Sequence, residues 1–111
     1  MDNNQTSKTN ADRRRELQSI LEGIMEGNKV YFQPPSNVKM SYPCIRYKLA
    51  DIETRNAGNK KYKTTNRYEV ILIDSSPISK YVDPIMELEY SSFERTYSAD
   101  NLNHYVFTIF K

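Results

Sequence analysis

YPCIRYKLADIETRNAGNKKYKTTNRYEVILID, residues 42–74, contains two runs of alternating apolar residues that flank a polar, basic segment. In the first run, residues 42–49, successive side chains point to opposite faces, so one face is apolar and the other carries Arg46 and Lys48. The second run, residues 68–73, is apolar on both faces, as expected for a strand that is covered on both sides. We therefore predict a long hairpin whose second strand is the central strand of a sheet.

The segment between the two runs, residues 51–65, is longer than an ordinary hairpin loop and is mostly polar. Residues 51–67 carry a net charge of +3, whereas residues 76–111 carry −2. We expect the segment to be disordered or extended in the free subunit and to contact an acidic protein surface, with a solvated loop or a contact with nucleic acid as the alternatives. The candidate contact residues are Arg55, Lys60, Lys61, Tyr62, Lys63 and Arg67.

Upstream of the hairpin, residues 12–26 have the pattern of an amphipathic helix. Its apolar stripe consists of Leu17, Ile20, Leu21, Ile24 and Met25. Asp12 is the expected N-cap, and Gly27 and Asn28 stand where a left-handed end of the helix is expected.

The start of this helix and the next strand supply candidate residues for a subunit interface. Three arginines begin the helix, where cations oppose the macrodipole, so helix stability does not explain them. A solvated basic turn is the favoured interpretation and an electrostatic contact is the alternative. The protein has nine tyrosines and four phenylalanines, which fits strands and also subunit interfaces. The interface candidates are Arg13, Arg14, Tyr31 and Phe32.

Proline positions limit the elements on both sides of the hairpin. The sequence predicts a short strand at 30–33, which Pro34 and Pro35 end, at an edge of the sheet. After the hairpin, Ser-Pro and Asp-Pro signals predict short helices at 77–82 and 84–88 rather than one continuous helix.

The last part of the chain returns to strand patterns at 92–97 and 104–109, which we expect to pair as a second hairpin. Its turn is assigned to Asp100, Asn101 and Asn103, since Asx residues tolerate left-handed geometry. The predicted fold is α+β: a mainly antiparallel sheet of about five strands, flanked by an N-terminal helix and one or two short helices.

Length and composition set the remaining limits. We expect a flexible tail at 1–11, which has no apolar anchor, and a single domain at 12–111. The net charge of +2 is too small to argue by itself for nucleic acid or for a membrane surface. No apolar run approaches the ~20 residues that span a bilayer, and residues 1–11 lack the apolar region of a signal peptide. We expect a protein made in the cytoplasm without a membrane partner.

No group of residues predicts catalysis. The only histidine, His104, has no partner at a diagnostic spacing, so a structural or surface role is favoured. The single cysteine, Cys44, excludes an intramolecular disulfide and is expected in the core or an interface. Glu87 and Glu89 are two residues apart on a predicted helix and do not share a face. We expect no enzyme, no cofactor and no metal.

Four stretches, taken in order, resemble the tail terminator and tail-completion proteins of long-tailed bacteriophages, which are also called minor tail or neck proteins. They are LQSILEGIMEGNKVYFQPP (17–35), YPCIRYKLAD (42–51), NRYEVILIDSSP (66–77) and ADNLNHYVFTIFK (99–111). The resemblance covers nearly the whole chain from Arg13 onward. It depends on the order and spacing of the stretches, because none of them is a catalytic signature.

The resemblance implies an antiparallel sheet flanked by helices and a ring of subunits, commonly a hexamer, at the head-proximal end of the tail tube. Such a ring ends tube growth and joins the tail to the head, while DNA passes through its lumen without specific binding. The implied partners are further copies of the chain, the tail tube protein and neck or head-completion proteins. The implied location is the virion, after assembly in the host bacterial cytoplasm. A head-side neck adaptor and a small nucleic-acid-binding module that uses residues 51–67 are the alternatives.

Overall fold

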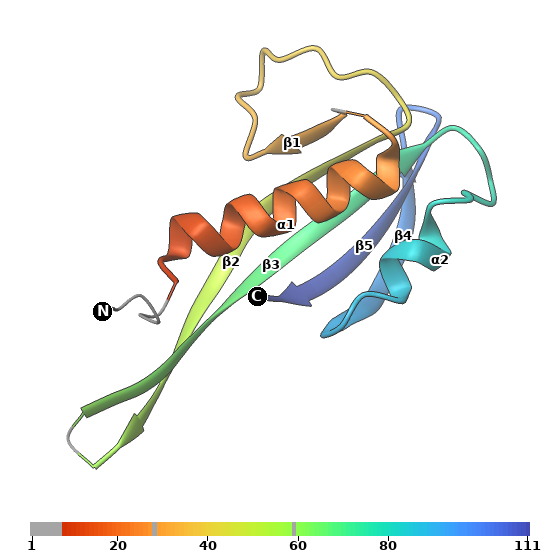
Figure 1. Cartoon of the computed structure of the whole chain (residues 1–111). Coiled ribbons are helices and arrows are strands. Elements are labelled where there is room, and N and C mark those ends of the chain that lie inside the picture. The colour runs from red at the N-terminus through yellow and green to blue at the C-terminus, as the bar shows by residue number, and fades with distance from the viewer. Residues whose placement is uncertain (1–7, 28, 59) are drawn as a thin grey trace.

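The described residues form a five-stranded sheet, with helices α1 and α2 against one of its sides (Figure 1). The computed structural model describes residues 8–27, 29–58 and 60–111, and for 55–57 and 60–63 it describes the backbone alone. The strands are β1 (Val30–Phe32), β2 (Cys44–Ala57), β3 (Lys60–Asp74), β4 (Ser91–Ala99) and β5 (Leu102–Phe110). Their order is β1-β2-β3-β5-β4, and only β1 and β2 are parallel among these pairs. The predicted α+β class, the central β3 and the edge position of β1 are confirmed.

Helix α1 (Asn10–Met25) packs most of its predicted apolar stripe against the sheet, whereas Ile20 is exposed at the margin of the stripe. Leu17, Leu21 and Met25 are buried, because residues at this spacing lie on one face of a helix. The strands contribute these buried residues to the same core: Ile45, Tyr47, Tyr68, Val70, Leu72, Phe107 and Ile109. The main hydrophobic core therefore lies between α1 and the three inner strands.

Both ends of α1 differ from the prediction. Thr9, not Asp12, is the N-cap: the Thr9 hydroxyl accepts the Asp12 N–H at 3.0 Å, and the Asp12 carboxylate accepts the Thr9 N–H at 3.1 Å. This reciprocal capping box moves the start of the helix upstream. At the other end Glu26 adopts the left-handed conformation (φ 60°), and the Gly27 N–H donates to the Glu22 carbonyl at 3.1 Å. The predicted left-handed end at Gly27 is wrong by one residue, and Asn28 lies outside the described residues.

The predicted flexible tail at 1–11 is too long. Residues 1–7 lie outside the described residues, but Thr9 caps α1, and Asn10 is its first residue. The Lys8 ammonium also lies 2.5 Å from the Glu16 carboxylate. These contacts make residues 8–11 part of the helix start, which a count of apolar anchors does not detect.

The other side of the sheet, which we call the open face, carries a second and smaller apolar cluster. Cys44, Ile71, Ile73 and Val106 are buried there. The side chains packed over them are Tyr31, Met40, Tyr97 and Leu102. β3 is therefore apolar on both faces, as predicted, although the layer on the open face consists of single side chains rather than a helix.

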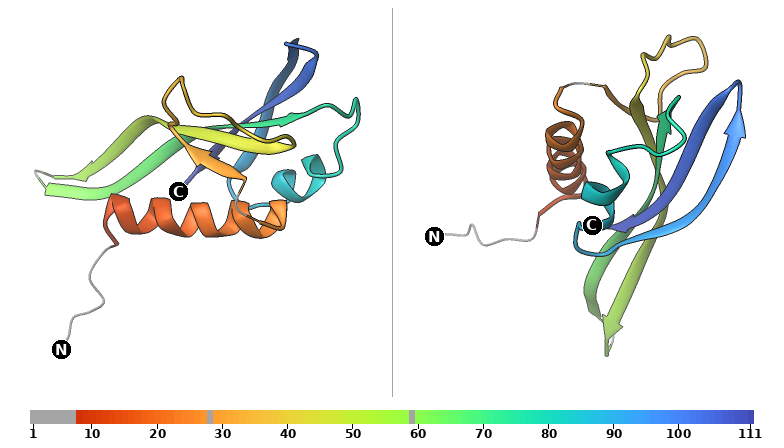
Figure 2. Two further views of the ribbon diagram at one scale, coloured as in Figure 1. Left: turned by 90° about the horizontal axis from the view of Figure 1, so that it is seen from above. Right: turned by 90° about the vertical axis from the view of Figure 1, so that its right-hand side faces the viewer.

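The predicted loop at 51–65 is instead a two-stranded extension of β2 and β3 beyond the body of the sheet (Figure 2). We call residues 51–65 the arm. β5 pairs with β3 from Arg67 onward, and the Lys111 N–H donates to the Asn66 carbonyl at 2.9 Å, so within the described chain the arm strands pair only with each other. Gly58 reverses the chain at φ 65°. The sequence pattern did not predict these strands, because a ribbon that is solvated on both faces needs no apolar alternation.

The arm gives the protein an elongated shape. The principal extents are 50 × 29 × 26 Å, and the radius of gyration is 15.8 Å. A compact chain of this length has a radius of gyration of about 13 Å. The ladder of the arm is irregular, with register shifts between Leu49 and Asp51 and between Arg55 and Asn56.

A single short helix, α2 (Val82–Met86), joins β3 to β4 in place of the predicted helices at 77–82 and 84–88. Pro84 does not interrupt it, because it lies in the first turn, where the missing N–H has no intrahelical partner. The fully buried Ile85 anchors α2 in the main core. Neither α1 nor α2 is long and apolar enough to cross a membrane.

The second predicted hairpin is confirmed, with both strands longer than the predicted 92–97 and 104–109. Asp100 and Asn101 form its turn with φ values of 55° and 63°. Positive φ at both central residues matches the twist of a two-residue hairpin turn. Asn103, which was also assigned to the turn, belongs to β5.

Replacing Leu21 with alanine should lower the free energy of unfolding by about 2–5 kcal/mol, because its side chain is 0% exposed in the main core. Ile20→Ala is the matched control, since Ile20 lies in the same turn of α1 but is 38% exposed, and it should cost clearly less. Urea denaturation of both variants and the wild type measures the difference. An unchanged midpoint for Leu21→Ala would contradict the packing of α1 on the sheet.

Candidate functional site

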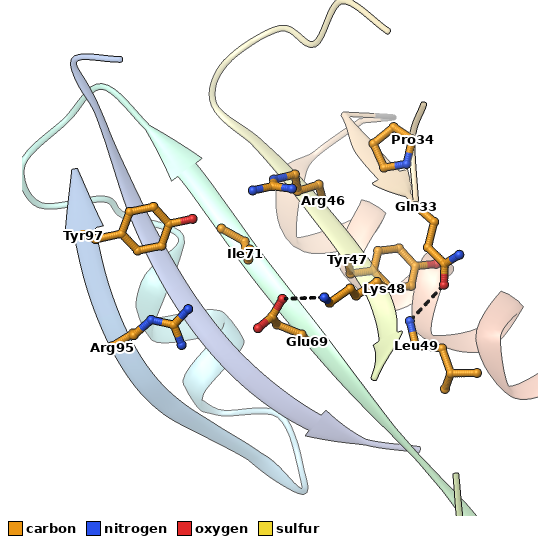
Figure 3. A pocket seen from close by; sticks show the side chains of 10 residues that line it. All are labelled: Gln33, Pro34, Arg46, Tyr47, Lys48, Leu49, Glu69, Ile71, Arg95 and Tyr97. Atoms are coloured by element: carbon orange, nitrogen blue, oxygen red, sulfur yellow. Dashed lines mark hydrogen bonds and ion pairs between the residues drawn. The ribbon is translucent and has the colours of Figure 1, made fainter. Parts of the chain in front are cut away.

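The open face contains a groove with a volume of about 550 Å³ (Figure 3). Strand alternation produces it. Ile45 and Tyr47 are buried under α1, so Arg46 and Lys48 point to the open face. The groove is lined by side chains that include Arg46, Lys48, Glu69, Ile71, Arg95 and Tyr97. We call this set of side chains the groove.

The groove is net positive, and its cations are weakly engaged. The Lys48 ammonium lies 3.8 Å from the Glu69 carboxylate, and the Arg95 guanidinium lies 3.6 Å from the carboxylate of its neighbour Glu94. Exposed ion pairs at such distances contribute little, so both cations remain available to a partner. Arg46 forms no ion pair with any residue for which side chains are described. The groove therefore suits a partner that presents carboxylates or other anions.

The floor of the groove is apolar and well packed. Ile71 is only 6% exposed. The Tyr97 ring stacks on the His104 imidazole, with centroids 4.6 Å apart and ring planes at 14°. The Arg95 guanidinium lies 5.8 Å from the centre of the Tyr97 ring, and His104 Nδ1 lies 3.2 Å from the Leu102 carbonyl oxygen. His104 thus has the structural role that we expected for it.

The predicted partner-contact residues are distributed along the arm. Arg55 pairs with Lys63 across the ladder. Lys61 pairs with Asn56, and Lys60 pairs with Ala57. The register shift leaves Tyr62 without a cross-strand partner. The side chains of these five candidates lie outside the described part of the structure. Arg67, the sixth candidate, lies at the base of the arm, opposite Phe110 of β5.

The predicted interface residues do not form one surface. Arg14 and Phe32 come together on the helix side, where the Arg14 guanidinium lies 4.6 Å from the Phe32 ring centre and donates to the Tyr47 hydroxyl at 3.3 Å. Burial raises the pKa of Tyr47, which keeps this hydroxyl protonated. The Arg13 guanidinium donates to the Lys8 carbonyl at 2.9 Å. Tyr31, by contrast, packs on the open face. These contacts lie within one subunit, so the interface role stays a prediction.

Sequence reasoning missed the groove, although it placed Arg46 and Lys48 on the outward face of their strand. Arg95 and Tyr97 come from β4, which lies on the far side of β5. Strict alternation along β4 would place Phe93 and Arg95 on one face, but a register shift between them sets Phe93 opposite Phe107 of the main core and Arg95 opposite Val106 of the open face. No local pattern reveals this shift, or that the strand order brings the outward residues of β4 beside those of β2. Only the pairing of β3 with β5 brings the two sets of side chains together.

The remaining groups that could react or hold a metal are the Cys44 thiol and the His, Asp and Glu side chains. Cys44 is 0% exposed, and burial raises the pKa of its thiol to about 11. The thiol is therefore protonated at neutral pH, and Cys44 is a core residue, as expected. Among the residues that the structure describes, no three His, Cys, Asp or Glu side chains are grouped to hold a metal ion.

The native protein should react slowly with iodoacetamide at pH 8, because the thiolate is the reacting form and folding raises the Cys44 pKa to about 11. Unfolding in guanidinium chloride returns the thiol to its ordinary pKa of about 8.5 and should make labelling fast. A Cys44→Ser, Ser36→Cys variant is the control, since residue 36 is exposed and should react quickly in the folded state. Intact-mass spectrometry measures the labelled fraction, and rapid labelling of the native wild type would refute the burial of Cys44.

Comparison with known proteins adds no functional assignment. No protein-family profile matches this sequence, and no curated protein matches it significantly. The functional proposal therefore depends on the resemblance of the four sequence stretches and on the surfaces described above.

Proposed function

We propose that this protein is a structural subunit of a long-tailed phage, which forms a closed ring at the head-proximal end of the tail. The ring ends the growth of the tail tube and provides the surface to which the head is joined. Its partners are further copies of the same chain, the tail tube protein and neck or head-completion proteins. DNA passes through the lumen without being bound specifically.

The arm is the observation that carries this proposal. Residues 51–65 extend beyond the strands that β1 and β5 support, and a two-stranded ribbon alone is marginally stable in water. Ile52 on the arm is 45% exposed. A subunit that functions alone gains nothing from such an extension, whereas a subunit in an assembly can bury it against a neighbour. The basic residues at its distal end favour an acidic protein surface as that neighbour.

The placement of the four resembling stretches gives further support. They coincide with the second half of α1 and with β1, the start of β2, the body of β3 and the whole of β5. These elements build the main core and the centre of the sheet. The resemblance therefore concerns the framework of the fold rather than its surface connections.

The two sheet edges also fit a ring. β1 is three residues long and precedes two prolines, so its edge offers little for pairing. β4 is nine residues long, and within the described chain its outer edge has no strand beside it. A ring of identical subunits covers such an edge through heterologous contacts that close on themselves.

Deleting the gene from the phage should produce over-long tails, because a terminator stops the addition of tube subunits. Electron microscopy of the particles measures tail length, and complementation with the wild-type gene is the control. Tails of normal length that are detached from full heads would instead indicate a neck adaptor. Normal infectious particles would refute both structural roles.

The nucleic-acid alternative makes a different prediction for the purified protein. A ring subunit should assemble to a multiple of 13.0 kDa without DNA, and light scattering after gel filtration measures this mass. A nucleic-acid-binding module should instead bind short duplexes with an affinity that falls steeply with salt. Such salt-dependent binding by a protein that stays monomeric would contradict the ring.

Shortening the arm should separate folding from assembly. Replacing residues 54–64 with Asn-Gly joins the directly paired Glu53 and Thr65 through a favourable two-residue turn. We expect a folded subunit, because none of the side chains described in this range belongs to the main core, together with defective tails in complementation. Thermal unfolding measures the first property and electron microscopy the second.

A second variant distinguishes the length of the arm from its charge. Replacing Arg55, Lys60, Lys61 and Lys63 with serine keeps the length and removes the cations. If charge makes the contact, both variants give abnormal tails. Normal infectious particles from the shortened variant would contradict a role for the arm.

A further inference from the structure

We propose, on the basis of the proposed ring, that neighbouring copies bind through opposite faces: the acidic surface of α2 in one copy seats in the groove of the next. The acidic surface consists of Asp83 and Glu87 on and beside α2 and Glu89 in the turn that follows. The groove is the one that contains Arg46, Lys48 and Arg95 on the open face. Each copy would use both surfaces, one on each side.

The acidic surface is accessible and rigidly held. Asp83, Glu87 and Glu89 are all exposed, and none of them takes part in the ion pairs found among the described residues. Asp83 and Glu87 are four residues apart, so they lie on the same side of the short helix. On the opposite side Ile85 is fully buried in the main core. The carboxylates are thus presented from a fixed element rather than from a mobile loop.

Apolar side chains beside these carboxylates complement the floor of the groove. Met86 is 42% exposed and precedes Glu87 in the chain. Tyr90 is 75% exposed and follows Glu89, and both line a surface pocket with Lys8, Arg13 and Lys111. The groove offers Ile71 and the stacked ring of Tyr97 between its cations. Large apolar residues surrounded by charges are typical of protein-binding surfaces. The contact between the α2 surface and the groove would then have apolar packing at its centre and ion pairs at its rim.

The charges of the two surfaces determine which surfaces of two copies can face each other. The two acidic surfaces of a symmetric dimer would repel each other, and so would two grooves. An acidic surface and a groove attract, and the planar guanidinium groups of Arg46 and Arg95 match carboxylates in a bidentate geometry. When a second copy of this chain occupies the groove, it therefore does so with its α2 surface.

The positions of the two surfaces lead to a ring. α2 lies with α1 on one side of the sheet (Figure 2). The groove is lined by side chains on the other side. A contact between two different surfaces of the same molecule is heterologous, and it generates a ring when the rotation closes. The same arrangement repeated around an axis would bury every groove and every acidic surface.

Charge reversal tests the contact. Arg46→Glu with Arg95→Glu makes the groove acidic, and Asp83→Lys with Glu87→Lys makes the α2 surface basic. Each double variant alone should raise the dissociation constant of self-association by about a hundredfold, because like charges then face each other. Sedimentation equilibrium measures this constant, and thermal unfolding checks that each variant is folded. The neutral pairs Arg46→Gln with Arg95→Gln and Asp83→Asn with Glu87→Gln serve where a reversal impairs folding.

Mixing the two double variants in equal amounts is the decisive step. Each acidic groove then meets a basic α2 surface, and each remaining basic groove meets an acidic α2 surface. The mixture should recover the mass of the wild-type assembly in an alternating ring with an even number of subunits. Co-expression should likewise restore normal tails to phage that lacks the gene. Lys39→Glu with Arg15→Glu is the matched control, since it makes the same change of charge at exposed positions outside the groove and should leave assembly intact.

Two results would overturn this contact while leaving the ring itself in place: wild-type assembly by either double variant, or no recovery in the mixture. A groove variant that still assembles but no longer binds a short DNA duplex in fluorescence anisotropy would assign the groove to phosphates instead. If the wild type stays monomeric and phage without the gene makes normal tails, the proposed ring fails together with the contact.

Discussion

The burial of Tyr68, Val70 and Leu72 beneath α1 sets the direction of every other side chain in the sheet. Side chains alternate along strands, so a slip of one residue would move Glu69 into the core and these three residues into solvent. The ladders on either side of β3 transmit its register to β2 and β5, and register shifts in β2 and β4 change the alternation locally. The stripe of α1 then has only one apolar surface on which it can pack.

A consequence of this arrangement is that the two faces of the sheet differ in their covering. The helix side has a continuous layer of α1 and α2 over a large core. The apolar cluster that the structure describes on the open face has four buried residues and a covering of single side chains. A domain of this size has material for one substantial core. The charged half of the open face therefore stays accessible, and its chemistry suits recognition by contact with another surface.

The arm and the body obey different physical rules. In the body each strand is held by neighbours on both sides or by a helix, and apolar burial stabilises it. In the arm the described strands pair only with each other, and the register shifts at its base and near its tip interrupt the ladder. The arm is consequently the part of the sheet that gains most from a neighbouring molecule. Its basic end and the acidic surface near α2 make the charge of the protein strongly uneven.

The sequence by itself determined the elements whose patterns arise from burial. The stripe of Leu17, Leu21 and Met25 and the doubly apolar run of β3 predicted α1, the central strand and the α+β class, because the core imposes periods of 3.6 and 2 on the residues that enter it. The outward direction of Arg46 and Lys48 followed from the same alternation.

Only the tertiary structure decided what burial does not encode. The side chains described in the arm are exposed or partly buried, so its strands resembled a loop in the sequence. The start of α1 depends on a reciprocal bond between Thr9 and Asp12 rather than on apolar residues. The groove depends on strand order, which places Arg95 and Tyr97 across the sheet from Arg46. Strand order results from the packing of all elements together, and no local pattern carries it.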